Sequence, residues 1–252
     1  MTKSGVNFFA RGPGECLGCH DRVMTATVAP VGRPPRPRSG PVRRIVFALG
    51  VLMILAGLGF LLYCGWQYFG TNIVSKQKQA EIKQSISTDW SNGIDGDEVG
   101  LLRVKRFGAD YEAPIVKGFD DKSLAEGVGW DPKSARPGKI GNFAIAAHRV
   151  THGEPFAKFP KLRKGDEVVV ETRTKIFTYR LRNSGTSITV DFSVGWPLQR
   201  VPDPDAAGER PTKSVITMLT CSELFHTRNR NVVIGDLVSQ KDKRTGKTTT
   251  VR

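Results

Sequence analysis

The chain has 252 residues, enough for one sizeable domain with appendages, and carries 38 lysines and arginines against 24 aspartates and glutamates. A net charge of +14 is compatible with nucleic-acid binding, but its distribution argues against that function. The basic residues gather before a long apolar run and near the end of the chain, and no aromatic residues are interleaved with them for bases to stack on. We therefore expect no nucleic acid among its partners.

The first 44 residues are rich in glycine, proline and arginine. Such a segment cannot bury enough apolar surface to offset its chain entropy, so residues 1–44 are predicted to form a disordered, basic, cytoplasmic tail. Cys16, Cys19 and His20 match the C-x-x-C-H pattern of haem attachment, which requires an exported and folded segment. We expect neither haem nor another cofactor in this chain.

An uncharged run extends from Ile45 to the residue before Lys76. Its apolar part is long enough to cross a bilayer as a helix, which takes about 20 residues. Arginines precede the run and aromatic residues follow from Tyr63, as the positive-inside rule and an interfacial belt require. The run is too long for the core of a cleavable signal peptide, and no A-x-A site follows it. We predict a single membrane anchor at residues 45–69, with the N-terminus cytoplasmic and the remainder extracytoplasmic.

Residues 70–96 are predicted to be a stalk or linker, with a weak helical signal at residues 77–87. Beyond it, short apolar and β-branched segments alternate with Gly, Pro and Asp, which predicts an all-β barrel or sandwich at residues 97–240. The expected strands are residues 101–106, 113–116, 142–147, 167–172, 176–181, 187–190, 215–220 and 231–238.

Two further segments of this region stand out. Residues 192–213 contain four prolines and are too long for a simple connection, and loops of this length tend to be functional. Residues 241–252 form a basic tail whose charge would suit an anionic wall or membrane.

A lone cysteine ends one expected strand, and an arginine precedes the next. Cys221 follows residues 215–220, and Arg230 stands before residues 231–238. Antiparallel pairing would bring the two side chains together. A thiolate is a far better nucleophile than a thiol and is favoured by nearby positive charge, while a guanidinium can also stabilise an oxyanion. A cysteine at a strand end is nevertheless more often a small buried apolar residue.

A histidine ends another expected strand. Residues 142–147 are mostly apolar and lead to His148, after which the sequence turns polar. His148 and His152 are four residues apart, a spacing that binds zinc on a helix when a glutamate follows the first histidine. Here Arg149 takes the place of that glutamate, and the segment has the pattern of a strand followed by a loop. We expect no metal site.

Together these segments resemble the sortases, the membrane-anchored cysteine transpeptidases of Gram-positive surfaces, and most closely the class E type of high-GC species. Residues 142–156 are similar to the histidine motif of that class. Residues 217–221 are similar to the family's T-L-x-T-C, with Met218 in the leucine position. Arg230 stands nine residues after the cysteine, the spacing of classes C, D and E. The resemblance covers roughly residues 99–238.

The resemblance implies a closed, mostly antiparallel β-barrel with short helices, preceded by one transmembrane helix. It implies that Cys221 attacks the threonyl carbonyl of an LPxTG-type or LAxTG-type sorting motif in an exported protein, forming a thioester. His148 then protonates the leaving glycine amine and assists the incoming amine of a cell-wall precursor or pilin. Arg230 holds the substrate backbone and the oxyanion, and Thr220 makes a hydrogen bond in the same groove.

Two positions depart from the family pattern and leave the peptide preference open. Residues 129–131 read Gly-Trp-Asp where Gly-His-Tyr is frequent, and Ala147 stands where glycine is common. Three alternatives also remain. An L,D-transpeptidase-like wall enzyme carries arginine two residues after its cysteine, where this chain has Glu223. A pilin-polymerising sortase usually adds a lid and a second membrane segment. In a non-catalytic anchored scaffold, Cys221 would be structural.

Overall fold

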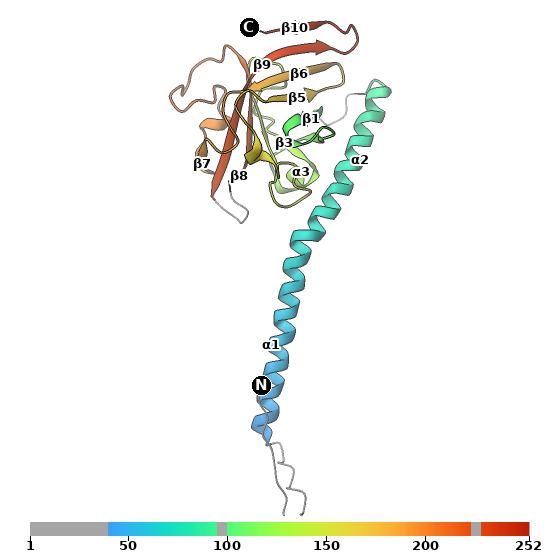
Figure 1. Cartoon of the computed structure of the whole chain (residues 1–252), viewed down its shortest axis with the longest axis vertical. Helices are drawn as coiled ribbons and strands as arrows, with labels where there is room; N and C mark the ends of the chain where they lie inside the picture. The colour runs from blue at the N-terminus through green and yellow to red at the C-terminus, as the bar shows by residue number, and fades with distance from the viewer. Residues whose placement is uncertain (1–39, 95–99, 223–227, 252) are drawn as a thin grey trace, which may run out of the picture. The chain divides into compact units, whose positions relative to one another are not determined.

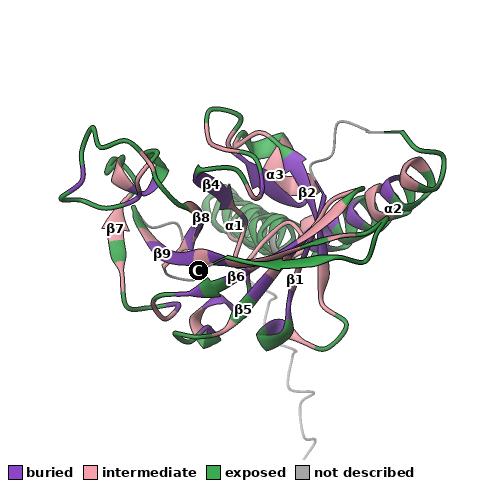
Figure 2. Cartoon of the chain, turned by 90° about the horizontal axis from the view of Figure 1, so that it is seen from above, coloured by how far each residue is buried: buried purple, intermediate pink, exposed green. Residues whose placement is uncertain are grey.

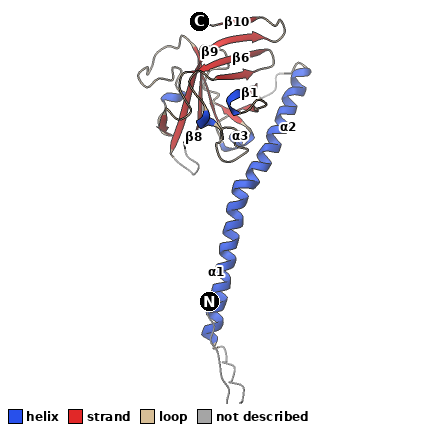
Figure 3. Cartoon of the chain, viewed as in Figure 1, coloured by secondary structure: helices blue, strands red, loops and turns tan. Residues whose placement is uncertain are grey.

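The computed structural model of the chain describes residues 40–94, 100–222 and 228–251. The predicted basic tail, with Cys16 and Cys19, lies outside these ranges except for its last residues. Residues 41–44 are helical, so α1 (Pro41–Gly65) begins before the predicted start of the anchor at residue 45. Figures 1 and 3 trace the helices and strands along the chain.

After Arg43 and Arg44 in its first turn the first helix is uncharged and mostly apolar, and its large apolar side chains are exposed (Figure 2). Of the helices described, α1 alone is long and apolar enough to cross a membrane. A π-helical turn, Trp66–Gly70, joins α1 to α2 (Thr71–Ser91). The segment expected to be a stalk with a weak helical signal is therefore mostly one regular helix.

The strands after α2 close into a barrel. Their bounds are β1 (Gly100–Val104), β2 (Glu112–Lys117), β3 (Val128–Trp130), β4 (Gly141–Ala146), β5 (Glu167–Glu171), β6 (Lys175–Leu181), β7 (Thr189–Asp191), β8 (Ser214–Cys221), β9 (Asn229–Asp242) and β10 (Thr248–Thr250). Around the ring the order is β9-β6-β5-β1-β2-β3-β4-β8, and β8 pairs back with β9. Only β2–β3 and β4–β8 are parallel among these pairs, so the predicted closed, mostly antiparallel barrel is confirmed.

The remaining elements are short. Helix α3 (Asp121–Glu126) connects β2 to β3, and the Asp120 carboxylate caps it by accepting from the backbone N of Ser123 at 3.0 Å. Single 3-10 turns lie at Lys105–Phe107, Phe159–Lys161 and Trp196–Leu198. β7 and β10 pair with β9 outside the ring. Since β9 continues to Asp242 and pairs with β10, the segment expected to be a basic tail is largely the end of a β-hairpin.

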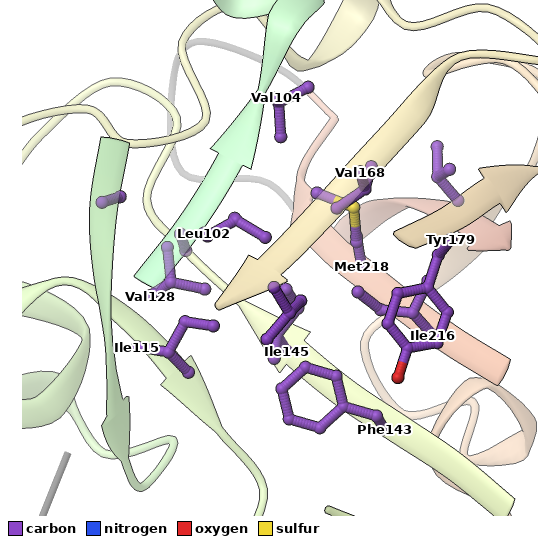
Figure 4. Packing of buried hydrophobic residues seen from close by; sticks show 14 of the residues in the cluster. Leu102, Val104, Ile115, Val128, Phe143, Ile145, Val168, Tyr179, Ile216 and Met218 are labelled. Carbon is purple, nitrogen blue, oxygen red and sulfur yellow. The ribbon is translucent and has the colours of Figure 1, made fainter. Parts of the chain in front are cut away.

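Alternate residues of the strands fill the inside of the barrel. On β6, Phe177, Tyr179 and Leu181 are buried while Arg180 between them is exposed, which is the period of two that gives a strand one apolar face. Figure 4 shows the cluster that they join, which includes Leu102, Phe143, Ile145 and Met218. Burial of each large apolar side chain contributes about 1.5–3 kcal/mol, so this cluster makes the barrel a rigid support for the ends of its strands.

Candidate active site

The ends of three adjacent strands bring the three predicted catalytic residues together. β8 lies between β4 and β9, and its last residue, Cys221, is the register partner of Arg230 on β9. The expectation that antiparallel pairing sets these two residues side by side is thus confirmed. β4 runs parallel to β8 with Ala146 opposite Leu219, so His148 follows at the same end of the sheet.

Cys221 is half-buried and is not part of a disulfide. The residues before it on β8 are more deeply enclosed, because Val215, Ile216 and Met218 belong to the buried core. A thiol at this strand end is therefore supported by the core without being sealed inside it. Partial exposure is what a nucleophilic cysteine requires, since the reacting carbonyl must reach the sulfur.

Two hydrogen bonds fasten the turn that carries His148 to the end of β8. The buried hydroxyl of Thr220 donates to the carbonyl of Ala147 at 2.8 Å. The guanidinium of Arg149 donates to the carbonyl of Ser222. One bond thus lies just before His148 and the other just after it, so the histidine is positioned relative to Cys221 from both sides.

The hydroxyl of Thr220 already donates to a carbonyl within the protein. Its predicted hydrogen bond in the substrate groove therefore stays a prediction. The sequence pattern does not predict the contact of Arg149 with Ser222, which the structure reveals. The sequence signal for that contact was slight, since an arginine after a strand is ordinarily solvated.

His148 is half-buried and stacks against His152 from the loop that follows β4. The two ring centroids are 4.5 Å apart, with an angle of 29° between the ring planes. The Nδ1 atom of His152 lies 3.0 Å from the hydroxyl oxygen of Thr151. The two histidines, four residues apart in sequence, are therefore stacked against each other in this loop.

The two arginines near Cys221 have different surroundings. The Nε atom of Arg228 lies 3.1 Å from a carboxylate oxygen of Asp191, and its guanidinium lies 5.1 Å from the ring centroid of Phe192. The pKa of Asp191 falls to about 2, because Ser193 donates from its hydroxyl and its backbone and Arg228 donates a third hydrogen bond. A lowered pKa keeps this pair intact until the pH falls towards that value. Arg228 is thus occupied at β7, whereas Arg230 is the residue opposite Cys221.

The long segment at residues 192–213 is anchored away from the histidine. The buried side chain of Asn142, near the start of β4, donates to the carbonyls of Pro197 at 2.8 Å and Gln199 at 2.9 Å. His148 follows the opposite end of the same strand. A polar residue in an otherwise apolar strand was the available sign of this anchor.

Of the residues that depart from the family pattern, Asp131 is half-buried, whereas Trp130 and Ala147 are buried. Trp130 and Ala147 are each 5% exposed and belong to the barrel core. The indole N–H of Trp130 donates to the carbonyl of Ala135 at 3.1 Å. These side chains therefore affect a peptide groove only through the residues packed on them.

Helix α2 also reaches this end of the barrel, which the sequence did not indicate. The side chains of Asn72 and Gln79 make hydrogen bonds with the loop that follows β4. Single amides in a polar helix are typical of a solvated face, so only the tertiary structure reveals their partners.

Comparison with known proteins gives one family. The profile of the sortase domain matches residues 102–238. The chain is 31% identical to sortase SrtE1 of Streptomyces coelicolor over 214 residues, covering 79% of this chain but only 59% of SrtE1. It is 30% identical to sortase SrtE2 of the same organism over 233 residues, covering 83% of this chain and 89% of SrtE2. The crystal structure of sortase E1 from Streptomyces coelicolor with a tripeptide in its active site matches with a TM-score of 0.51 and 33% identity, over 59% of this chain and 92% of that one.

Proposed function

Because the chain belongs to the sortase family of cysteine transpeptidases, we propose that it cleaves a C-terminal sorting signal between threonine and glycine and transfers the threonyl end to an amine. The pairing of Cys221 with Arg230, beside the strand end that leads to His148, carries the proposal. Acyl transfer requires a nucleophile, a proton donor and a group that stabilises the oxyanion. These residues supply one of each.

The reaction proceeds in two acyl transfers. The thiolate of Cys221 attacks the threonyl carbonyl carbon, and the negative charge moves to its oxygen, where Arg230 donates hydrogen bonds. The Thr–Gly bond breaks when His148 gives its proton to the glycine nitrogen, leaving a thioester on Cys221. An incoming amine then attacks the thioester, His148 takes the amine's proton, and Cys221 leaves as a thiolate.

The substrate is proposed to be an exported protein with an LPxTG-type or LAxTG-type motif, and the acceptor an amine of a cell-wall precursor or pilin. A tripeptide occupies the active site of the related Streptomyces coelicolor structure, which supports a peptide substrate here.

A panel of sorting peptides tests this proposal. The full chain in detergent is incubated with LPxTG and LAxTG peptides, and mass spectrometry is used to find which peptide leaves its acyl group on Cys221. We expect an acyl-enzyme with at least one motif and a ligated product once an amine acceptor is added. Acylation by a wall stem peptide instead would favour the L,D-transpeptidase alternative. A thiol that takes no acyl group and resists maleimide would favour the scaffold.

We further propose that α1 anchors the protein with its N-terminus in the cytoplasm and the barrel outside. Arg43 and Arg44 at the start of α1, with the arginines before them, favour this orientation. Protease added to intact cells stripped of their wall is expected to digest the barrel and spare residues 1–44. Protection of the barrel would show the opposite orientation.

Thr220 is proposed to act on the reaction through the turn before His148. Thr220→Val keeps the shape of the side chain but leaves the Ala147 carbonyl without its donor. We expect the free energy of unfolding to fall by about 1–3 kcal/mol and peptide turnover to fall about tenfold, as His148 shifts relative to Cys221. Denaturant titration and peptide turnover measure the two effects. Thr178→Val on β6 is the matched control, and equal behaviour of the two variants would refute the role of Thr220.

A further inference from the structure

Helix α2 carries a stripe of buried polar side chains. Asn72 and Gln79 are each 9% exposed and Ser75 is 5% exposed, and their spacing places them on one face of the helix. On the other face, Ile73 and Val74 are 61% and 56% exposed. The first part of α2 therefore docks mainly through hydrogen bonds, whereas the buried residue further along the helix, Ile86, is apolar.

These amides bind the loop that follows His148. The Asn72 side chain donates from Nδ2 to a carboxylate oxygen of Glu154 at 2.6 Å and accepts at Oδ1 from the backbone N of Gly153 at 2.8 Å. Two helical turns later, Nε2 of Gln79 donates to the carbonyl of His152 at 3.1 Å. Two side chains of α2 thus hold three successive residues of the loop.

The same three loop residues have left-handed backbone conformations. Their φ angles are 55° at His152, 81° at Gly153 and 56° at Glu154. Each of the two non-glycine residues costs roughly 1–3 kcal/mol in this conformation, so the loop needs outside contacts to keep it. A Cβ atom on Gly153 would lie 2.7 Å from the amide nitrogen of Gln79, which shows how closely the helix approaches. The conformation of the loop therefore depends on α2.

The loop conformation in turn determines what supports His148. The His152 ring stacks on the His148 ring, and the backbone N of Phe156 donates to the His148 carbonyl at 3.0 Å. The hydroxyl of Tyr111 donates to the Pro155 carbonyl at 2.8 Å, and burial raises the pKa of this hydroxyl above its ordinary value, so it remains a donor. A change in the backbone at His152 would move the ring on which His148 rests.

We propose that Asn72 and Gln79, acting through His152, are positioning residues for His148, so that the helix after the membrane anchor completes the active site. This inference rests on the proposed function, because it concerns the step in which His148 gives its proton to the leaving amine. Among the described residues, the hydrogen bonds of the two amide side chains are with the loop after His148 and not with Cys221 or Arg230. Their loss therefore leaves the nucleophile intact and misaligns the acid, and misplacement by about 1 Å can cost up to about 100-fold in rate.

The first test compares the two amide residues that contact the loop with an exposed glutamine of the same helix. Gln79→Ala and Asn72→Ala are measured against Gln77→Ala, since Gln77 is exposed. With the full chain in detergent and its best sorting peptide, we expect kcat for acylation to fall about 10- to 100-fold in each of the first two variants, with KM unchanged. Alkylation of Cys221 by a methanethiosulfonate reagent should keep the wild-type rate. Gln77→Ala should match the wild type in all three measurements.

The second test uses a rescue. Asn72→Asp places a second carboxylate against that of Glu154, so kcat should fall as in Asn72→Ala. Adding Glu154→Gln supplies a new donor to the aspartate, and kcat should return to within about threefold of the wild type. A double variant no more active than Asn72→Asp alone contradicts the role proposed for the contact between Asn72 and Glu154.

The outcomes separate this inference from the proposed function. If the wild-type chain forms no acyl-enzyme with any sorting peptide, the proposed function fails and the inference fails with it. If the wild type is acylated while Asn72→Ala and Gln79→Ala keep the kcat of Gln77→Ala, only the inference fails. A loss confined to KM, or an equal loss of alkylation, also overturns it, because the defect would then lie in the peptide groove or the fold.

Discussion

Replacing Cys221 with alanine is expected to abolish the acyl-enzyme altogether, because no atom is left to carry the acyl group. His148→Ala should behave differently. In this variant the Cys221 thiol still reacts with small alkylating reagents, but the peptide amine cannot leave because its proton donor is missing. Loss of an acid–base group typically costs about 10² to 10⁴ in rate, and we expect a loss of that size in transpeptidation. Mass spectrometry of the acyl-enzyme and alkylation kinetics together separate the nucleophile from the acid.

The pH dependence of acylation provides a second measure of the same pair. Attack requires Cys221 as the thiolate, and departure of the amine requires His148 as the imidazolium, so the rate should pass through a maximum as pH rises. If Cys221 and His148 interact, the rising and falling sides of the pH profile each report on both residues together and not on one of them. The histidine assignment is wrong if His148→Ala keeps near wild-type transpeptidation while His152→Ala or His226→Ala loses it. His226 lies outside the described residues.

Arg230→Lys is expected to be nearly as damaging as Arg230→Ala. A lysine keeps the positive charge, but only the planar fork of a guanidinium can hold a peptide carbonyl and an oxyanion with paired donors. Removal of an oxyanion donor typically costs about 10² to 10³ in kcat, and both variants should lie in that range. Turnover of the best peptide measures the loss.

Arg228 is the matched control for this prediction, because it stands two residues away and pairs with Asp191. Arg228→Ala should therefore retain most of the activity. An inactive Arg228→Ala beside an active Arg230→Ala would show that the wrong arginine has been assigned.

β8 and β9 could be predicted from the sequence because their signals are local. β8 and β9 are apolar and β-branched, and Cys221 and Arg230 mark where one ends and the other begins, so pairing alone aligns them. β3 and β10 cannot be predicted in this way, because three residues are too few to show a period. The parallel pairing of β4 with β8 is a finding of the structure alone, since residues far apart in sequence leave no periodic trace in either strand.

The buried face of helix α2 and its partners could not be predicted from the sequence pattern. Its buried residues are Asn72, Ser75, Gln79 and Ile86. Because most of them are polar, no apolar stripe in the sequence predicts which face of the helix is buried. Its length comes from continuity with the preceding helix through Trp66–Gly70, and its partners are backbone groups of a left-handed loop. Such contacts depend on the folded loop, and nothing in the helix alone identifies them.

The parallel pairing of β4 with β8 also affects how the site is assembled during folding. Cys221 and Arg230 are nine residues apart and meet by closing a short connection. Thr220 and Ala147, which join the histidine turn to β8, are 73 residues apart. The entropy lost in closing a loop grows with its length, and non-local pairings slow folding. Cys221 and Arg230 thus belong to a local hairpin, whereas His148 reaches them only across a long-range contact. A partly folded chain can therefore pair Cys221 with Arg230 before His148, the proposed proton donor, is in place.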